Sequence, residues 1–279
     1  MDHGRRADPG LGADVAERRA AGHQSVRRVS LSDPQEGRVA HIIWAVGLGG
    51  LGAIFGSFIA TVAVRWPAPA YIGRSRCDGC ARTLRAVELV PVLSWVALRG
   101  RCQTCRAGIG PLHPAIEIFG AVIGVAAGLS AVGPAAIAIA VFGWLLLLIG
   151  AIDFVAFRIP NPLSLTLALL GLAGGLAGVA PPLADRVIGG VSGFASLYAV
   201  AHAYRTVRGR MGLGGGDAKL FGAIGLWLGW QTLPGVLLIA CLLGLGWALA
   251  RRMRADERLP LGTLLAVAAF GMGIAANLR

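Results

Sequence analysis

Charged residues are scarce in this sequence: Asp, Glu, Lys and Arg make up only 14% of its 279 residues, whereas 56% are hydrophobic. Soluble globular domains carry about 25% charged residues. The shortage therefore excludes an ordinary soluble domain and indicates a membrane protein. The 42 glycines fit this class, because small residues let helices approach closely in lipid.

The sequence also lacks any basic run interleaved with aromatic residues, the pattern on which nucleic-acid bases stack. Its net charge of +12 comes from clusters in three segments: eight arginines between Arg65 and Arg106, four basic residues between Arg205 and Lys219, and four arginines between Arg251 and Arg258. The loops at 130–134, 181–186 and 231–234 contain a single arginine, Arg186. Basic loops stay on the cytoplasmic side of a membrane protein, so the charge predicts topology and no nucleic-acid partner.

Residues 1–40 contain no apolar run. They mix seven arginines with six acids, which predicts a disordered N-terminal tail. The tail is not a signal peptide, because the apolar stretch after it is long enough to span a membrane and is followed by no small-residue cleavage site. The topology puts this tail outside the cytoplasm.

About eight apolar segments approach the 20 residues that a membrane-spanning helix needs. The predicted spans are 41–64, 115–129, 135–152, 162–180, 187–203, 220–230, 233–250 and 259–276. The sequence thus predicts an all-α polytopic integral membrane protein. After the tail come a first transmembrane helix (41–64), a cytoplasmic loop domain (65–114) and a transmembrane core (115–279), with the lipid bilayer as a partner.

Four cysteines in the loop form two C-x-x-C pairs separated by 21 residues: Cys77, Cys80, Cys102 and Cys105. This spacing is typical of a closed structural zinc site, whose binding energy would fold a loop too small for its own core. Two disulfides are the alternative, but they need an oxidising compartment, whereas the arginines indicate the cytoplasm. Cys241, within an apolar span, is interpreted as a packing residue.

Two acids at the ends of predicted spans, Asp153 and Asp217, are candidates for catalysis, since an ionisable group near a membrane span is costly. Two carboxyl groups that share a proton can activate water and protonate a peptide carbonyl. Each acid also has a structural reading, with Asp153 paired to Arg158 and Asp217 as a helix N-cap. Asp185 is interpreted as a helix cap, whereas Glu117 has three possible partners: the zinc loop, a substrate amine or an arginine.

Motifs along residues 44–270 resemble those of type IV prepilin leader peptidases. They are Phe55-Gly56-Ser57-Phe58, Arg65-Trp66-Pro67, the two cysteine pairs with Glu88-Leu89-Val90-Pro91 between them, His113-Pro114-Ala115-Ile116-Glu117, Asp153 with Ile159-Pro160-Asn161, and Gly214-Gly215-Gly216-Asp217-Ala218-Lys219. The last is a G-x-G-D motif, the type shared with presenilin-like intramembrane proteases. Two departures are Phe154-Val155, where many members carry a second acid, and Thr263, where many have proline.

The resemblance implies an inner-membrane aspartic endopeptidase with Asp153 and Asp217 as its catalytic dyad. Gly214, Gly216, Lys219 and Glu117 would support the site. The implied reaction is cleavage of a short basic leader after glycine, at the cytoplasmic face, from prepilins or type II secretion pseudopilins. It also implies N-methylation of the new N-terminus by S-adenosylmethionine, although no Rossmann-type G-x-G-x-x-G follows a predicted strand. Lys219 has two open roles: orienting Asp217 or a substrate carbonyl, or meeting lipid headgroups.

Two other functions are alternatives. A proton-coupled secondary transporter would carry its acids near the bilayer centre and show similar halves. A noncatalytic scaffold would use the zinc loop to recruit a partner, and its aspartates would be structural. The geometry of the two carboxyl groups discriminates between these functions and catalysis.

Overall fold

The computed structural model describes residues 34–67, 75–209, 212–254 and 257–277. The chain divides into two units, residues 1–40 and 41–279, and the features below lie in the second unless stated otherwise. Its eight long helices are α2 (Pro34–Arg65), α4 (Leu112–Ser130), α5 (Pro134–Ala156), α6 (Asn161–Leu176), α7 (Leu183–Arg208), α8 (Gly215–Leu228), α9 (Leu233–Arg251) and α10 (Leu261–Asn277). Three short helices complete the described part: η1 (Ala86–Leu89), α3 (Leu93–Ala97) and η2 (Trp230–Thr232).

The predicted all-α class is confirmed. Each of the eight predicted spans falls on one of the long helices, and the described residues contain only two isolated β-bridges and no strand. Five of these helices (α2, α4, α5, α7 and α9) are long and apolar enough to cross a membrane, so the chain is a multi-pass membrane protein. The helices α6, α8 and α10 are shorter, with 16, 14 and 17 residues, so length alone does not confirm eight spans.

The first helix begins at Pro34, seven residues before the predicted start of the first span. Proline fits the first position of a helix because its missing N–H would have no partner there, and Glu36 places an acid in the first turn. Residues 34–40 of the predicted disordered tail are therefore helical. The remainder of that prediction, residues 1–33, lies outside the described residues.

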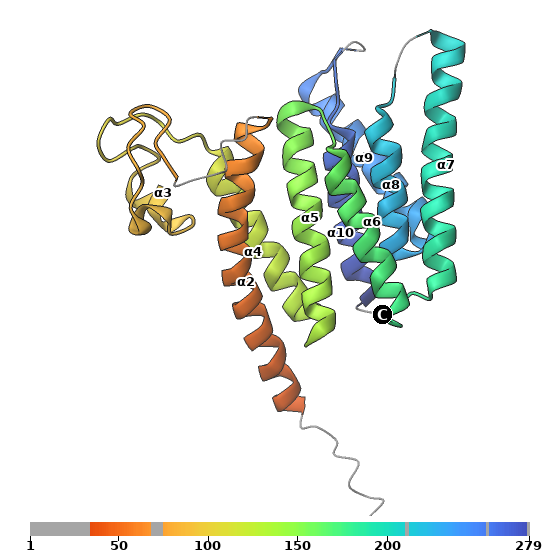
Figure 1. The fold of residues 1–279 in the computed structure, drawn as a ribbon, viewed down its shortest axis with the longest axis horizontal. Coiled ribbons are helices and arrows are strands. Elements are labelled where there is room, and N and C mark those ends of the chain that lie inside the picture. Colours follow the sequence, from red (N-terminus) through yellow and green to blue (C-terminus); the bar gives the residue numbers. More distant parts are fainter. Residues whose placement is uncertain (1–33, 68–74, 210–211, 255–256, 278–279) are drawn as a thin grey trace, which may run out of the picture. The chain divides into compact units, whose positions relative to one another are not determined.

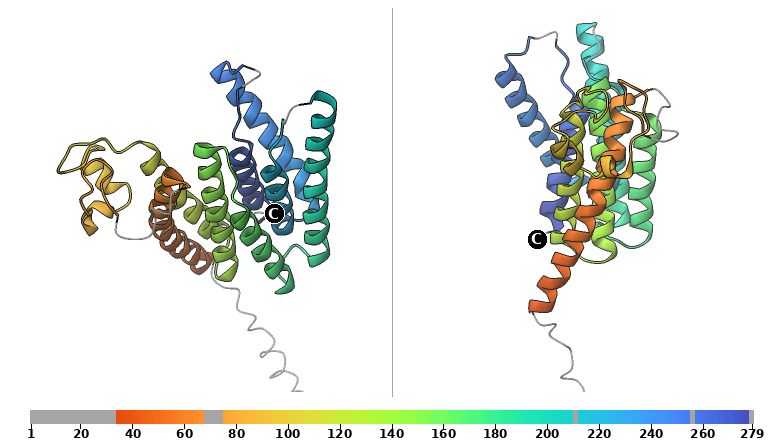
Figure 2. Two further views of the ribbon diagram at one scale, coloured as in Figure 1. Left: turned by 45° about the horizontal axis from the view of Figure 1, so that its top comes forward. Right: turned by 90° about the vertical axis from the view of Figure 1, so that its left-hand side faces the viewer.

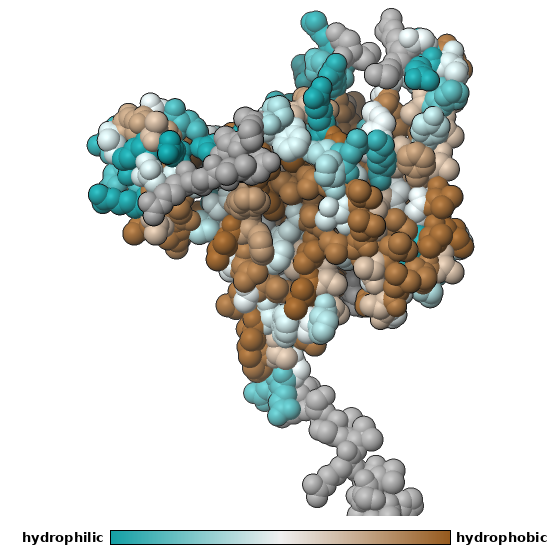
Figure 3. Space-filling view, viewed as in Figure 1, coloured by the Kyte–Doolittle hydropathy of each residue, from teal (hydrophilic) through white to brown (hydrophobic). Residues whose placement is uncertain are grey.

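The helices of residues 41–279 form two apolar cores that meet at α5. In Figures 1 and 2, α5 lies between α2 with α4 on one side and the remaining helices on the other. One core packs α2 and α4 against the face of α5 that carries Ile152. The other packs α6 to α10 against the face that carries Leu146 and Ile149. Figure 3 shows hydrophobic residues along the sides of the helices, with hydrophilic residues gathered at helix ends and over the loop between α2 and α4.

Glycines let α2 and α4 touch through their backbones. A Cβ on Gly52 would overlap the carbonyl group of Gly120, and a Cβ on Gly56 would lie 2.7 Å from the Cα of Glu117. Substitutions here would push the two helices apart. The contact brings Glu117 against the helix that leads into the cysteine-bearing loop.

Arg186 is buried in the first turns of α7, with 2% of its surface exposed. Its guanidinium donates hydrogen bonds to five backbone carbonyls, of Gly171, Val179, Ala180, Pro181 and Leu226, at 2.9 to 3.2 Å. Arg186 thereby ties the ends of α6 and α8 and the loop between α6 and α7 to α7. The prediction that it belongs to an exterior loop is wrong, because these carbonyls supply a polar site inside the helix bundle.

Arg186→Met should lower the stability of the folded protein by about 3 to 5 kcal/mol. Methionine fills similar space but leaves the buried carbonyls without their donor. Thermal unfolding in detergent measures the effect. Arg205→Met, which changes an exposed arginine near the other end of α7, is the control, with an expected change below about 0.5 kcal/mol. Equal unfolding temperatures for the two variants would contradict the proposed role of Arg186.

Candidate active site

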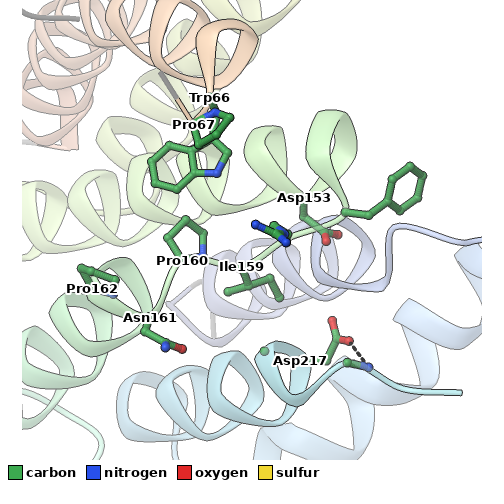
Figure 4. Close-up of a pocket in the computed structure, with 12 residues that line it drawn as sticks. Trp66, Pro67, Asp153, Ile159, Pro160, Asn161, Pro162 and Asp217 are labelled. Carbon is green, nitrogen blue, oxygen red and sulfur yellow. Dashed lines mark hydrogen bonds between the residues drawn. The ribbon is translucent and has the colours of Figure 1, made fainter. Parts of the chain in front are cut away.

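Asp153 and Asp217 line one pocket of about 550 Å³. Asp153 lies near the C-terminal end of α5 with 5% of its surface exposed, and Asp217 is the third residue of α8 and half-buried. Figure 4 shows their carboxyl groups pointing toward one another, and they are close enough to interact electrostatically. The other lining residues are Trp66, Pro67, Phe157, Arg158, Ile159, Pro160, Asn161, Pro162, Gly214 and Gly216.

The glycines before α8 hold Asp217 in place. The backbone N–H of Gly214 donates to Asp217 Oδ2 at 3.2 Å, which closes the first turn of the helix. A Cβ on Gly216 would lie 3.0 Å from the Cβ of Ile159, so glycine at this position lets the chain between α5 and α6 come close. The structural reading of Asp217 is therefore partly correct: it caps the helix from the third position while its carboxyl group lines the pocket.

The first turn of α10 orients Asp153. The backbone N–H of Thr263 donates to Asp153 Oδ2 at 2.9 Å, and Thr263 Oγ1 lies 3.3 Å from the same oxygen while donating to the carbonyl of Gly150 at 2.8 Å. A Cβ on Gly262 would lie 2.9 Å from Asp153 Oδ2. The predicted pairing of Asp153 with Arg158 is wrong: the two ion pairs found among the described residues involve other groups.

Lys219 bridges the two motifs that carry the pocket. Its Nζ donates to Asn161 Oδ1 at 2.9 Å and thus links α8 to the first residue of α6. The sequence left two roles open for Lys219, orienting Asp217 or a substrate carbonyl and meeting lipid headgroups. The contact with Asn161 is neither of these. Lys219 thereby connects the segment of Asn161 to the segment of Asp217, both of which line the pocket.

The arrangement supplies two carboxyl groups on separate helices, both in one pocket whose other lining residues are mostly apolar. Such a pair holds one shared proton more readily than two negative charges, because like charges at short distance repel. One carboxylate can then take a proton from water while the other carboxyl group donates one. This is the chemistry of an aspartic peptidase.

Comparison with known proteins shows the family of this chain. Residues 51–131 match the family model described as bacterial peptidase A24 N-terminal domain, and residues 140–249, which include both aspartates, match that of the type IV leader peptidase family. A prepilin leader peptidase/N-methyltransferase of Dickeya chrysanthemi is 34% identical over 266 residues, which cover 84% of this chain and 93% of that protein. The chain belongs to the type IV leader peptidase family.

Two more relatives of the same name show how far the likeness extends. The protein of Aeromonas hydrophila is 37% identical over 202 residues, covering 71% of this chain and 70% of that protein. The protein of Burkholderia pseudomallei is 42% identical over 201 residues, covering 70% of this chain, which spans 65% of the length of that relative. No solved structure matches the chain.

In this member of the leader peptidase family, the four loop cysteines form one cluster. Their Sγ atoms all lie within 4.8 Å of one another, with Cys77 Sγ and Cys105 Sγ 3.6 Å apart, and none of the five cysteines, all in the described part, is disulfide bonded. A tetrahedral zinc site with 2.3 Å bonds separates its sulfurs by about 3.8 Å.

Cys241 is exposed on α9, so its predicted packing role is wrong, because this face of α9 is not covered by protein.

The two cysteine pairs repeat one backbone pattern. Cys77 N–H donates to the carbonyl of Arg82 at 2.9 Å, and Cys102 N–H donates to that of Ala107 at 2.8 Å. The residue after each second cysteine, Ala81 or Arg106, has a positive φ of 55° or 59°. Backbone N–H groups of Cys105 and Thr104 lower the pKa of the buried Cys102 thiol to about 6, which favours the thiolate form that binds metal.

Ionic contacts tie residues 75–111, here called the cysteine loop, into one unit and attach it to α2 and α4. Arg65, at the end of α2, pairs with Asp78 at 2.8 Å. Arg82 binds both oxygens of Glu88, which with the Arg85 N–H lowers the pKa of Glu88 to about 2. Glu117 Oε2 accepts the N–H of Val92 at 2.7 Å, so of its three predicted partners the structure shows the loop.

The roles of Gly262 and Thr263 were missed by the sequence analysis. Their stretch stood out only as a departure from the family pattern, 110 residues beyond Asp153. A threonine at the start of an apolar helix gives no signal of its own. The contact becomes visible only when α10 packs against α5.

Thr263→Val should lower kcat for leader cleavage about 3- to 10-fold with little change in KM. The change removes the hydroxyl that fixes α10 to the Gly150 carbonyl and leaves the N–H donor to Asp153 in place, so it costs about one hydrogen bond. Thr263→Pro also removes the N–H and should cost more. Thr232→Val is the matched control, since that hydroxyl also binds backbone carbonyls but at the start of α9. Unchanged kcat in both Thr263 variants would remove the residue from the site.

Proposed function

We propose that this chain cleaves the short basic leader from prepilins or pseudopilins after glycine, at the cytoplasmic face of the bacterial inner membrane. The observation that carries the proposal is the pocket into which Asp153 and Asp217 both point, within the stretch that matches the leader peptidase family. The relatives bear the name prepilin leader peptidase/N-methyltransferase.

In the proposed mechanism, a water molecule between the two carboxyl groups attacks the carbonyl carbon of the scissile peptide bond. The ionised aspartate takes a proton from this water, and the protonated aspartate donates its proton to the carbonyl oxygen. Collapse of the tetrahedral intermediate breaks the carbon–nitrogen bond, and the leaving amine takes up a proton. Trp66, Phe157 and Ile159 give the pocket apolar walls for the extended chain around the cut.

The orientation follows from charge. The cysteine loop and the segments before α8 and after α9 carry most of the basic residues of 41–279, and basic loops face the cytoplasm. Asp217 lies at the start of α8, next to one of these segments, and Asp153 lines the same pocket from the end of α5. A transporter would carry its acids near the bilayer centre, so their position favours cleavage over transport.

The cysteine cluster is proposed to bind one zinc ion as a structural site. Four sulfurs within 4.8 Å of one another suit a tetrahedral thiolate site. Bound zinc would join the two cysteine pairs and so fold the loop. A closed four-sulfur site leaves no position for a reacting water.

Methylation of the new N-terminus is the second proposed activity and rests on the name that the relatives bear. The methyl donor would be S-adenosylmethionine, which supplies a methyl group bonded to a positively charged sulfur.

A cleavage assay in membranes tests the main proposal. The substrate is a model prepilin with a Lys/Arg leader, glycine at the cut and phenylalanine after it. Mass spectrometry of the product should show loss of the leader after glycine. An uncleaved substrate with folded protein present would overturn the proposal, and cleavage after another residue would correct the stated specificity.

A further inference from the structure

Residues 157–160, here called the α5–α6 link, form an extended segment in the wall of the pocket that the two aspartates line, here called the aspartate pocket. Phe157 ends α5 in the left-handed region, with a φ of 51°, and Pro160 precedes α6 with a φ of −66° and a ψ of 126°. The residue before a proline is kept out of the helical region by the proline ring. Pro160 therefore favours an extended backbone at Ile159.

The backbone N–H and C=O groups of Arg158 and Ile159 take part in no hydrogen bond with other described residues. An extended segment with unpaired groups is a template for pairing with another extended chain. Arg158 is exposed, so water reaches its backbone, whereas Ile159 is half-buried. Because buried backbone groups without a partner cost free energy, Ile159 is the link residue that gains most from a partner in the pocket.

The Ile159 side chain fixes the link beside both carboxyl groups. A Cβ on Gly216 would lie 3.0 Å from Ile159 Cβ, so the link touches the turn that carries Asp217. A Cβ on Gly262 would meet both Ile159 Cδ1, at 2.7 Å, and Asp153 Oδ2, at 2.9 Å. Figure 4 shows Ile159 next to the two aspartates. A peptide that pairs with the backbone of Ile159 therefore lies within reach of both carboxyl groups.

We propose that the substrate binds as an added β-strand, with one hydrogen bond to the N–H of Ile159 and one to its C=O. The inference rests on the proposed cleavage and adds how the chain around the cut is held. Main-chain hydrogen bonds to an unpaired edge are a general way of binding extended peptides. The partner is an extended peptide and not a helix, because a helix has already paired its own N–H and C=O groups.

This pairing gives a physical reason for glycine at the proposed cut. The chain around the cut has to leave any helical conformation before it can pair with Ile159, and glycine is a poor helix former. Glycine also lets the substrate backbone come close to the aspartates, because it has no side chain. Main-chain pairing reads no side chains, so leaders of different sequence are held alike.

Ester replacement in a synthetic model prepilin tests the pairing without changing the protein. Each substrate carries one ester oxygen in place of a backbone N–H, within three residues of the cut, and the scissile bond stays an amide because its nitrogen is the leaving group. Purified full-length protein in detergent should cleave one of these substrates with a kcat/KM about 3- to 10-fold below that of the all-amide prepilin, the effect of one lost hydrogen bond. Esters one residue to either side should cost less than about twofold, because a strand turns only alternate N–H groups toward its partner.

Ile159→Pro and Ile159→Ala separate the backbone of this residue from its side chain. Proline removes the N–H and suits an extended link, whereas alanine removes most of the side chain and keeps the N–H. Ile159→Pro should have a KM for the all-amide prepilin about 3- to 10-fold above that of Ile159→Ala, with similar kcat, because the lost hydrogen bond holds the substrate before and during the reaction. Thermal unfolding shows whether both variants are folded, and the ester series decides alone if the proline variant is not.

Equal kcat/KM values across the ester series would overturn the pairing while leaving the cleavage established. A KM of folded Ile159→Pro no higher than that of Ile159→Ala would also overturn it. An all-amide prepilin that the wild type leaves uncut would instead overturn the proposed cleavage, and the pairing with it.

Discussion

Replacing either Asp153 or Asp217 by asparagine should reduce leader cleavage by at least about 1,000-fold. The two carboxyl groups point into one pocket from different helices, and the proposed reaction needs one as a proton acceptor and the other as a proton donor. An amide can do neither, yet it has nearly the same size, so both variants should fold. Initial rates with the model prepilin, in membranes with matched protein levels, give the measurement.

Asp185→Asn is the control for these variants. Asp185 lies in the first turn of α7 and accepts a hydrogen bond from Trp230 Nε1 at 3.1 Å, and it does not line the aspartate pocket. Its cleavage rate should stay within about twofold of wild type. If Asp153→Asn or Asp217→Asn kept a comparable rate, that aspartate would have no part in the mechanism.

Removal of zinc should unfold the cysteine loop while the helices remain folded. Structural zinc contributes about 10 to 16 kcal/mol in small zinc domains, far more than a loop of this size gains by burying its own side chains. Elemental analysis should find one zinc ion per chain in the wild type and none in Cys102→Ser, which changes the cysteine with 4% exposure. Limited proteolysis should then cut the loop, and the Arg65 to Asp78 contact should be lost.

Leader cleavage should fall by at most about tenfold in Cys102→Ser, because α5, α8 and α10 supply the contacts of both aspartates. Cys241→Ser, on an exposed face of α9, is the control and should keep its zinc. A protease-resistant loop in wild-type protein that contains no zinc would show that the loop folds by another route.

Local sequence patterns predicted the helices well. Apolar length located all eight long helices. The cysteine spacing predicted the four-sulfur cluster, since two C-x-x-C turns bring their thiols to the same side. These features depend on residues that are close in sequence, or on residue types, such as cysteine, with few structural roles.

The features that sequence could not give depend on packing between distant segments. Arg186 looked like a loop arginine because its five partners are backbone carbonyls, which no sequence pattern reveals. Thr263 contacts Asp153 only because α10 crosses the end of α5. The predicted packing role of Cys241 is wrong because an apolar helix has the same sequence pattern whether its outer face contacts protein or lipid.

The 14 residues of α8 span only about 21 Å, whereas the hydrocarbon core of a bilayer is about 30 Å thick. A membrane-crossing helix of this length would create hydrophobic mismatch, which lipids relieve by thinning around it. Arg186 holds the Leu226 end of α8, so the thinning would bring the headgroups toward the opposite end, where Asp217 lies. The membrane beside the two aspartates would thus be a shallow depression, in which a substrate helix can stay in lipid while its charged leader remains in water.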